Sequence, residues 1–399
     1  MVFDVRGGGR RGDGRGDGRK DWCEVGALFL RLGCTAFGGP TAHIALMRRE
    51  IVEQRGWLDP QEFLDLVGAV NLVPGPNSTE LAIHIGYRRA GWKGFWAAGL
   101  GFILPAFVLV LALAALYARW GAMPLAQSAL RGGEPVVLAI VAHALWQFLP
   151  SAIKGPVTAL IACAALVAIY AGVSELHIII ATAIFGVLRS RCVKATPAPP
   201  MPAPPQPPEL RNKAAMLFLA GAGTGAAQGL FWTFLKIGSV LYGSGYVLFS
   251  FLRAEFVTTR LITDRQLLDA IAIGQFTPGP LFTSATFVGY QIGGLVGAIA
   301  ATVGIFAPAF VCVALLATML EKIRKSPRAR VFLDAVNAAS FALMTATTII
   351  LGRGIWNNSA ALVWPVVLFA LSLLALARSK WNPVWLLGAG VVCGLLLGR

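Results

Sequence analysis

The sequence predicts an all-α polytopic membrane protein made of two inverted-topology repeats, each with a broken or re-entrant helix interrupted at Pro-Gly-Pro. Three observations predict this fold class. Of the 399 residues, 56% are hydrophobic and only 13% are charged, whereas about a quarter of the residues of a typical soluble protein are charged. Several apolar runs approach the roughly 20 residues with which a helix crosses a bilayer. Finally, motifs of one half of the chain recur in the other half.

The apolar runs give the positions of the expected membrane helices. Residues 95–118 contain no charged side chain and form the clearest span. Strands of a membrane barrel would alternate apolar and polar residues, so these solid runs favour helices. Further spans are expected at 134–150, 155–173, 174–190, 296–320, 331–352, 360–377 and 383–398.

Two segments are unlike membrane helices and divide the chain. Residues 1–20 are rich in Gly, Arg and Asp, so they cannot bury a core and are expected to be disordered. Residues 197–208 contain eight prolines and are expected to form an extended polyproline linker. The predicted organisation is a disordered arm at 1–20, a first repeat at 21–194, a cytoplasmic linker at 195–212, a candidate extra transmembrane helix at 213–230, and a second, inverted repeat at 231–399.

The internal repeat is carried mainly by glycine and proline positions. FLRLG at 29–33 matches FLKIG at 234–238, and Pro-Gly-Pro at 74–76 matches Pro-Gly-Pro at 278–280. The offset between matched positions falls only from 205 to 203 residues along the repeat, which makes a chance similarity unconvincing. The other matched pairs are Gly38 and Gly243, Glu50 and Glu255, Asp65 and Asp269, Asn71 and Gln275, Gly86 and Gly289, Gly94 and Gly297, and Gly101 and Gly304.

The basic residues indicate that the repeats are inverted. Arg88, Arg89 and Lys93 precede the span at 95–118, whereas the basic cluster at 322–330 follows the matched span at 296–320. Because Lys and Arg are retained on the cytoplasmic side, the two matched helices should cross in opposite directions. Inverted repeats of this kind build many secondary transporters. We expect an inner-membrane protein with a cytoplasmic N-terminus and a periplasmic C-terminus. Three residues fit this scheme poorly, because it places them near the outer side: Arg253, Arg260 and Arg265.

The two Pro-Gly-Pro motifs predict a binding site for an anion. Pro74 should end the helix expected over 60–72, because the residue before a proline avoids the α region. Pro76 suits the first position of a new helix, and a helix N-terminus carries unpaired N–H groups and about half a positive charge. The alternative is that the prolines only kink two crossing helices; their matched positions in inverted repeats favour the binding site. The residues expected to contact the anion are Asn71, Pro74, Gly75, Pro76, Asn77, Ser78, Gln275, Pro278, Gly279, Pro280 and Thr283.

Charged residues at matched positions are further candidates. A dianion in a membrane needs cationic partners, so Arg31 and Lys236 are expected to help bind it, with snorkelling to the membrane surface as the alternative. Four matched acids can carry coupling protons or form caps and ion pairs, and pairing, with Arg48, Arg49 or Arg253, is the favoured reading. These acids are Glu50, Glu255, Asp65 and Asp269.

Other classes of function have weaker support. The six cysteines and four histidines are scattered, so neither a metal site, a cofactor nor a disulfide framework is expected. A membrane-embedded transferase would need a catalytic cluster, and the pairing of Glu50 with His43 is a weak candidate. The net charge of +15 fits basic cytoplasmic loops, so the bilayer, and not a nucleic acid, is the expected partner. The oligomeric state is left open, with a homodimer as one candidate.

Several motifs resemble the chromate transporter (CHR) family. In the first half they are FLRLGCTAFGGP, NLVPGPNST, GYRRAGWKG and GLGFILPAF, and in the second half FLKIGSVLYGSGY, QFTPGP and FVGYQIGG. The resemblance implies a long, two-domain inner-membrane protein that exports chromate, with coupling to the proton gradient or exchange for another oxyanion. It also implies that Arg31 and residues 74–76 are important. The sequence departs from the family pattern in its Gly/Arg-rich arm and in Ser244, which replaces the second glycine of FGGP.

The substrate is the part that the residues alone leave open. Chromate and sulfate are both tetrahedral dianions, and backbone or arginine donors would separate them poorly. The residues therefore predict an oxyanion transporter, with an anion channel as the alternative, and only the resemblance indicates chromate.

Overall fold

The computed structural model describes residues 18–71, 73–191, 225–316, 327–357, 363–378 and 382–397, and in these ranges the regular structure is entirely helical. Helix α1 already begins at Gly18, within the arm expected to be disordered. Four sequence-based expectations lie outside the described residues: the rest of the arm, the linker at 195–212, most of the candidate extra helix at 213–230, and the basic cluster from Lys322 to Lys325.

The helices of the first half follow the predicted order. Each repeat contains one long apolar helix after its break, and these are α4 and α12. The helices of the first half are α1 (Gly18–Thr35), α2 (Gly39–Arg48), the π-helix η1 (Arg49–Gln54), α3 (Pro60–Val70), α4 (Asn77–Trp120), α5 (Pro124–Ala152), α6 (Pro156–Tyr170) and α7 (Glu175–Arg191).

The second half repeats this order from α9 onward. Its helices are α9 (Gly225–Val240), the 3₁₀ turn η2 (Gly245–Val247), α10 (Leu248–Leu252), the π-helix η3 (Arg253–Val257), α11 (Asp264–Phe276), the 3₁₀ turn η4 (Leu281–Thr283), α12 (Ser284–Leu316), α14 (Pro327–Asn357), α15 (Val363–Arg378) and α16 (Pro383–Leu397).

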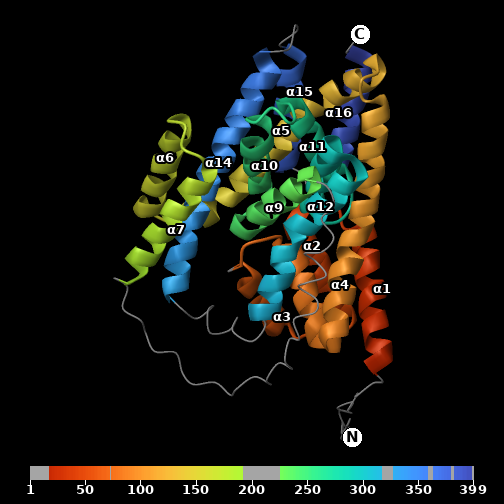
Figure 1. Cartoon of the computed structure of the whole chain (residues 1–399), viewed down its shortest axis with the longest axis vertical. Helices are drawn as coiled ribbons and strands as arrows, with labels where there is room; N and C mark the ends of the chain where they lie inside the picture. Colours follow the sequence, from red (N-terminus) through yellow and green to blue (C-terminus); the bar gives the residue numbers. More distant parts are fainter. Residues whose placement is uncertain are drawn as a thin grey trace, which may run out of the picture.

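Four of the described helical segments are long and apolar enough to cross a membrane: 77–120, 124–152, 281–315 and 329–356. Three shorter apolar helices fall where further spans are expected, at 156–170, 363–378 and 383–396. The polytopic helical fold predicted from the apolar runs is therefore confirmed. In Figure 1 the colour gradient shows that the later part of α4 runs toward the upper end of the molecule, whereas the later part of α12 runs in the opposite sense.

The long helices α4 and α12 each contain a chain reversal that the sequence analysis does not predict. In α4 the helical conformation is interrupted at Ala90 and Gly91, where Gly91 has φ 58° and ψ −144°. The two arms of this helical hairpin touch, because a Cβ atom at Gly86 would collide with the carbonyl oxygen of Gly94. Such close approach requires glycine on both arms. The matched reversal in α12 lies at Gly293 and Gly294, with φ 61° and ψ −149° at Gly294.

Backbone conformation matches between the repeats at other positions as well. Gly38 and Gly243 have φ values of 104° and 90°, and Gly75 and Gly279 have φ values of 137° and 96°. Both repeats also contain a π-helix shortly after this first glycine. In the first repeat η1 directly follows α2, and in the second repeat η3 directly follows α10. The repeat inferred from sequence is thus visible as a repeated backbone path.

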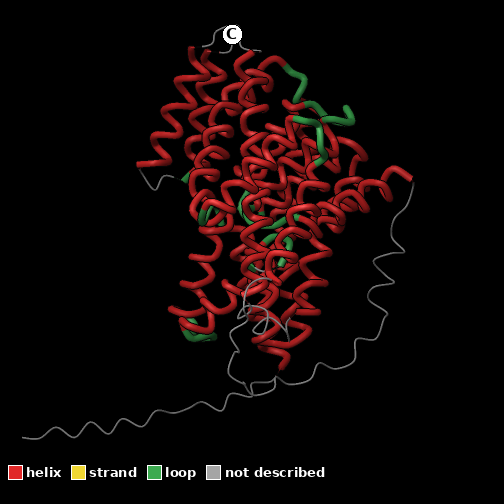
Figure 2. Tube along the Cα trace, turned by 90° about the vertical axis from the view of Figure 1, so that its left-hand side faces the viewer, coloured by secondary structure: helices red, strands yellow, loops and turns green. Residues whose placement is uncertain are grey.

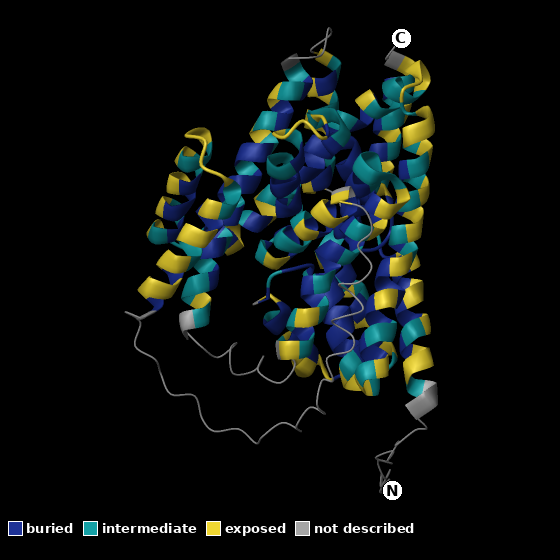
Figure 3. Cartoon of the chain, in the orientation of Figure 1, coloured by how far each residue is buried: buried dark blue, intermediate teal, exposed yellow. Residues whose placement is uncertain are grey.

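The core consists of a large cluster to which both halves contribute and a second cluster within the first half. Large side chains from both repeats are fully buried, among them Phe29, Phe102, Phe234 and Phe287. Figure 3 shows that buried residues are concentrated in the interior of the helix bundle. Exposed apolar side chains lie on outward faces, such as Val108 and Leu109 of α4, as expected for a helix that contacts lipid. Loop segments occur at mid-height of the molecule and are surrounded by helices (Figure 2).

Two of the arginines that fit the charge pattern poorly form ion pairs. Nε of Arg253 lies 2.9 Å from Asp264, and Nε of Arg265 lies 3.2 Å from Glu134. These pairs do not explain the mismatch, because the positive-inside rule counts basic residues and not net charge. Arg260 has φ 61° and occupies the turn between η3 and α11.

Candidate functional site

Both Pro-Gly-Pro motifs interrupt the chain between two helices, as expected. In the first repeat α3 ends at Val70 and α4 begins at Asn77; in the second, α11 ends at Phe276 and the η4 turn begins at Leu281. Pro76 and Pro280 are the residues immediately before the new helices, one position earlier than predicted. The first break passes directly into α-helix, whereas the second passes through a 3₁₀ turn before α12.

The two breaks are tied to the opposite repeats by reciprocal hydrogen bonds. The N–H of Gly75 donates to the carbonyl oxygen of Leu241 at 2.8 Å, and the N–H of Gly279 donates to that of Ala36, also at 2.8 Å. Leu241 and Ala36 are themselves matched positions, each just beyond the first helix of its repeat. Such reciprocity is the signature of a two-fold axis. It also means that these two glycine N–H groups are not free to bind a ligand in this arrangement.

His43 connects the two breaks in the interior. It is 1% exposed; its Nδ1 lies 3.3 Å from the hydroxyl of Ser78, and its Nε2 lies 3.1 Å from the carbonyl oxygen of Ala36. Because that carbonyl also accepts from Gly279, one backbone oxygen and one imidazole join both breaks. The breaks therefore lie close together.

A cavity of about 830 Å³ lies between the repeats next to the first break. Binding sites for small ligands usually measure roughly 300–1,000 Å³. Its lining comes from several parts of the chain: the turn after α1, the helix α2, the first break, α5, the YGSG turn, Leu376 of α15 and the start of α16. The polar residues that line it are Thr41, Asn71, Asn77, His143, Gln147, Ser151, Ser244, Tyr246 and Asn382.

Three helix N-termini open into this cavity. Gly38 and Pro40, at the start of α2, line it, as do Asn77, the first residue of α4, and Pro383, the first residue of α16. Neither α2 nor α4 has a side chain that caps its N-terminus. Because uncapped helix N-termini present unpaired N–H groups and a partial positive charge, the starts of α2 and α4 favour a negative ligand in this cavity.

The amide side chains expected at the breaks lie in or beside the cavity. Asn77 donates to Asn71 through a 2.6 Å hydrogen bond, and both line the cavity wall. Gln275 is buried, and its side-chain nitrogen has no hydrogen-bond partner among the described residues. The hydroxyl of Thr283 donates to the carbonyl oxygen of Pro280 at 2.8 Å and is buried. The hydroxyl proton of Thr283 is thus already used in a hydrogen bond to the backbone of its own break.

Arg31 and Lys236 lie outside the cavity lining and form matched ion pairs. Arg31 lies 2.5 Å from Glu50, and Lys236 lies 2.6 Å from Glu255. Glu50 has a second partner in Arg55 at 3.0 Å. Glu50 thus pairs with Arg31 and Arg55, and Glu255 pairs with Lys236; among the residues that the structure describes, the ion pairs do not join these acids to Arg48, Arg49 or Arg253. The lining contributed by described residues includes no lysine or arginine.

Asp65 and Asp269 occupy different surroundings despite their matched positions. Asp65 is partly exposed and accepts from the side chain of Gln61 at 3.0 Å. Asp269 is 1% exposed and accepts from the hydroxyl of Tyr117 at 2.7 Å. The pairing of Glu134 with Arg265 lies beside it, so Asp269 belongs to a buried polar network between α4, α5 and α11.

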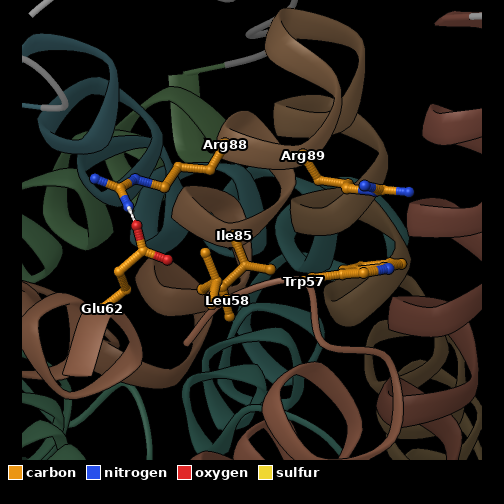
Figure 4. A pocket seen from close by; sticks show the side chains of 6 residues that line it. All are labelled: Trp57, Leu58, Glu62, Ile85, Arg88 and Arg89. Carbon is orange, nitrogen blue, oxygen red and sulfur yellow. Dashed lines mark hydrogen bonds and ion pairs between the residues drawn. The ribbon is translucent and has the colours of Figure 1, made fainter. Parts of the chain in front are cut away.

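A smaller cavity of about 360 Å³ lies beside the loop between η1 and α3, lined by Trp57, Leu58, Glu62, Ile85, Arg88 and Arg89. Figure 4 shows Arg88 directed at Glu62, 3.5 Å away, and Arg89 extended above Trp57. The guanidinium carbon of Arg89 is 5.1 Å from the centre of the Trp57 ring, a cation–π distance. Both arginines have carboxylate partners, Arg89 with Asp21 at 3.4 Å. Their charge is therefore compensated, which favours the larger cavity as the ligand site.

Sequence reasoning missed several residues of the larger cavity. His143 and Gln147, 2.7 Å apart on α5, have no matched counterpart that would single them out. The starts of α2 and α16 do carry signals in the sequence. Pro40 follows two glycines, and Asn382 precedes Pro383. In the structure Asn382 caps α16, because its side-chain oxygen accepts a hydrogen bond from the N–H of Val384. The residues that the structure describes contain no group of three His, Cys, Asp or Glu side chains that could hold a metal ion.

Comparison with known proteins places the chain in a family. The sequence model described as "Chromate transporter" matches residues 23–187 and 228–395, one stretch in each half of the chain. The chain belongs to the chromate transporter family. The resemblance drawn from the Pro-Gly-Pro and glycine motifs is thereby confirmed.

Three relatives of this family member show how far the similarity extends. A protein of Pseudomonas aeruginosa named "Chromate transport protein" is 31% identical over 385 residues, which cover 94% of this chain and 92% of the relative. A protein of the same name from Cupriavidus metallidurans is 30% identical and covers 91% of this chain and 90% of its own. A "Probable chromate transport protein" of Synechococcus elongatus is 26% identical over 82% of this chain and 83% of its own. All three are named as transport proteins and not as enzymes. No solved structure matches the chain.

Proposed function

We propose that the protein exports chromate from the cytoplasm across the inner membrane, and that the anion binds in the cavity between the two repeats. The observation that carries this proposal is the convergence of two uncapped helix N-termini, those of α2 and α4, on one polar cavity at the first break. The names of the relatives support chromate as the substrate. The N-terminus is cytoplasmic and the C-terminus periplasmic in this proposal.

The ligand is held without a permanent cation. Amide groups of Asn71 and Asn77, the ring of His143 and the backbone N–H groups at the starts of α2 and α4 are the donors that face the cavity. The N–H groups of Thr79 and Glu80 already donate to Pro76, so the first turn of α4 offers the N–H groups of Asn77 and Ser78. Sulfate and other tetrahedral dianions have the same shape and charge and are the competing substrates.

The membrane potential alone favours export of a dianion. Moving one charge through 100 mV is worth about 2.3 kcal/mol, and a dianion gains about twice that on leaving a negative interior. The proposed transport cycle is alternating access, in which the two repeats rock around the shared site. A channel is the alternative, and it is distinguished by a conductance in planar bilayers that exceeds carrier turnover.

The test is chromate accumulation in cells with and without the protein, followed by uptake of radiolabelled chromate and sulfate into proteoliposomes. We expect cells that contain the protein to accumulate less chromate. The double variant Asn71→Ala, Asn77→Ala should lose transport, whereas Glu53→Gln, an exposed position on η1, should not. Equal accumulation in both cell types contradicts export of chromate, and unchanged transport by the double variant contradicts the site.

A further inference from the structure

Glu80, in the first turn of α4, is a buried carboxyl group that the transport scheme above does not use. The residue is 0% exposed. Neither of its carboxyl oxygens has a hydrogen-bond partner among the described residues, and none of the described ion pairs includes it. Buried acids in proteins are normally paired with a cation or hydrogen-bonded. Glu80 is therefore an exception that needs a physical explanation.

Among the residues that the structure describes, no cation lies close enough to neutralise Glu80. Its carboxyl group faces the backbone of the first break, because a Cβ atom built on Gly75 would lie 2.5 Å from Oε1. The ionisable groups of the second repeat close enough to interact with it are Tyr242 and Cys312. His84 follows one turn later on α4 and is itself buried. The cations Arg31 and Lys236 are held by Glu50 and Glu255.

Glu80 is also close to the proposed anion site. Asn77, which lines the cavity, precedes it by three residues on α4, and residues at this spacing lie on the same face of a helix. An ionised Glu80 would place a negative charge beside the helix terminus that faces the anion, and would cancel the partial positive charge of that terminus. Two like charges in a medium of low dielectric repel strongly.

We propose that Glu80 is a proton-binding site coupled to the oxyanion site, so that one proton is carried by Glu80 whenever the oxyanion occupies the first break. This proposal rests on the function proposed above. The neutral carboxyl group leaves the α4 terminus free to bind the anion, and the bound anion in turn favours the neutral carboxyl group, because such linkage is reciprocal. Proton and oxyanion then cross together, and each cycle moves one net negative charge instead of two.

The coupling is a property of the first repeat only. The matched turn of the second repeat has Thr283 and Ser284 in place of an acid. A single acid at one of two otherwise similar breaks sets the stoichiometry at one proton for each oxyanion.

The first experiment asks whether Glu80 is protonated, and it needs no substrate. Infrared spectra of the purified full-length protein and of Glu80→Gln are compared at neutral pH. We expect the wild type to show the carbonyl stretch of a protonated carboxyl group and the variant to lack it. The matched control is Glu53→Gln, the same chemical change at an exposed residue of η1 that pairs with Arg48 at 3.9 Å. Identical spectra of wild type and Glu80→Gln would overturn the proposal.

The second experiment measures proton movement in proteoliposomes that contain a pH-sensitive dye. An outward gradient of chromate should drive protons out with the anion in the wild type and in Glu53→Gln. In Glu80→Gln we expect chromate movement to persist, because the amide imitates the neutral acid. The accompanying proton flux should fall to that of protein-free vesicles. Proton flux that persists in Glu80→Gln overturns the proposal. Absence of chromate and sulfate movement in the wild type contradicts the proposed function instead, and the infrared result then decides on Glu80 alone.

Discussion

The first and second breaks follow nearly the same backbone path, yet their side chains differ. In the first repeat, the helix after the break carries Glu80 and His84, whereas the second repeat has Ser284 and Phe287 in the matched turns. His43, which links the two breaks, corresponds to Leu248. The ionisable groups in the helix after the break thus belong to the first repeat, while glycine and proline are retained in both breaks. The comparison separates what the fold requires from what the ligand requires.

The largest expected effect concerns the glycines that both repeats share. A Cβ at Gly279 would lie 2.7 Å from Cβ of Ala106, whereas at Gly75 the nearest atom is the end of the Glu80 side chain. Both have positive φ, but only the first clash is with an atom fixed to the backbone. Gly279→Ala should therefore lower the unfolding free energy by about 3 kcal/mol and Gly75→Ala by about half as much.

Thermal unfolding of the purified variants in detergent measures this difference. Gly133→Ala is the control, because it lies within a helix with no atom within 4 Å of its added Cβ. Equal losses for Gly75→Ala and Gly279→Ala would show that backbone strain, and not the neighbouring atom, decides the cost.

The second comparison concerns the matched aspartates. Asp269→Ala removes the acceptor of the buried Tyr117 hydroxyl and should destabilise the protein by about 2 kcal/mol. Asp65→Ala, at a partly exposed position, should change stability by less than about 0.5 kcal/mol. Unfolding in a denaturant series tests the pair. Adding Tyr117→Phe to Asp269→Ala should recover part of the loss, and purely additive effects would argue against the hydrogen bond.

The third comparison concerns the matched ion pairs. Glu50 has two guanidinium partners and a side chain that is 13% exposed, whereas Glu255 has one ammonium partner and is 27% exposed. Arg31 itself is about half exposed, so solvent screens its charge. Double-mutant cycles to alanine should give a coupling of about 1 kcal/mol for Arg31 with Glu50 and about half that for Lys236 with Glu255. Direct binding of the substrate by Arg31 makes a different prediction. In that case the apparent affinity for the substrate that is lost in Arg31→Ala stays lost when Glu50 is replaced as well.

The smallest expected effect concerns the residue that begins each helix after the break. Asn77 lines the cavity, and its counterpart Leu281 is buried and apolar. Asn77→Leu should raise the KM for chromate about fivefold, because a neutral hydrogen bond contributes about 1 kcal/mol. Leu281→Met, which keeps the apolar volume, should leave the KM unchanged. Initial rates of chromate uptake in proteoliposomes measure both, and a larger effect at Leu281 would move the site to the second break.

The sequence predicts the fold best where one local rule decides. Pro74 and Pro278 stop helices by steric exclusion, so both breaks can be located from the sequence to within a residue or two. The chain reversals at Gly91 and Gly294 were missed because helical periodicity continues through them. The hairpins depend on contact between Gly86 and Gly94 and between Gly289 and Gly297, and such contacts between segments leave little local signal.

The site is less predictable for a similar reason. Asn71 and Asn77 flank a break and could be found, whereas His143, Gln147 and Asn382 reach the same cavity from helices distant in the chain. Arg31 and Lys236 attract attention as charges in apolar helices, yet each neutralises an acid on the neighbouring element. Glu80 resembles an ordinary polar residue near a helix start, and only its burial without a partner distinguishes it.

The exchange of hydrogen bonds between Gly75 and Leu241 and between Gly279 and Ala36 has the form of a homodimer contact enclosed in a single polypeptide. Each half gives a donor and receives one, so either half by itself would leave the N–H group of its own break unsatisfied in the interior. If the two halves were expressed as separate chains, they would therefore have to insert in opposite orientations and find each other before either could complete its fold. Covalent linkage of the halves guarantees both the partner and its antiparallel placement.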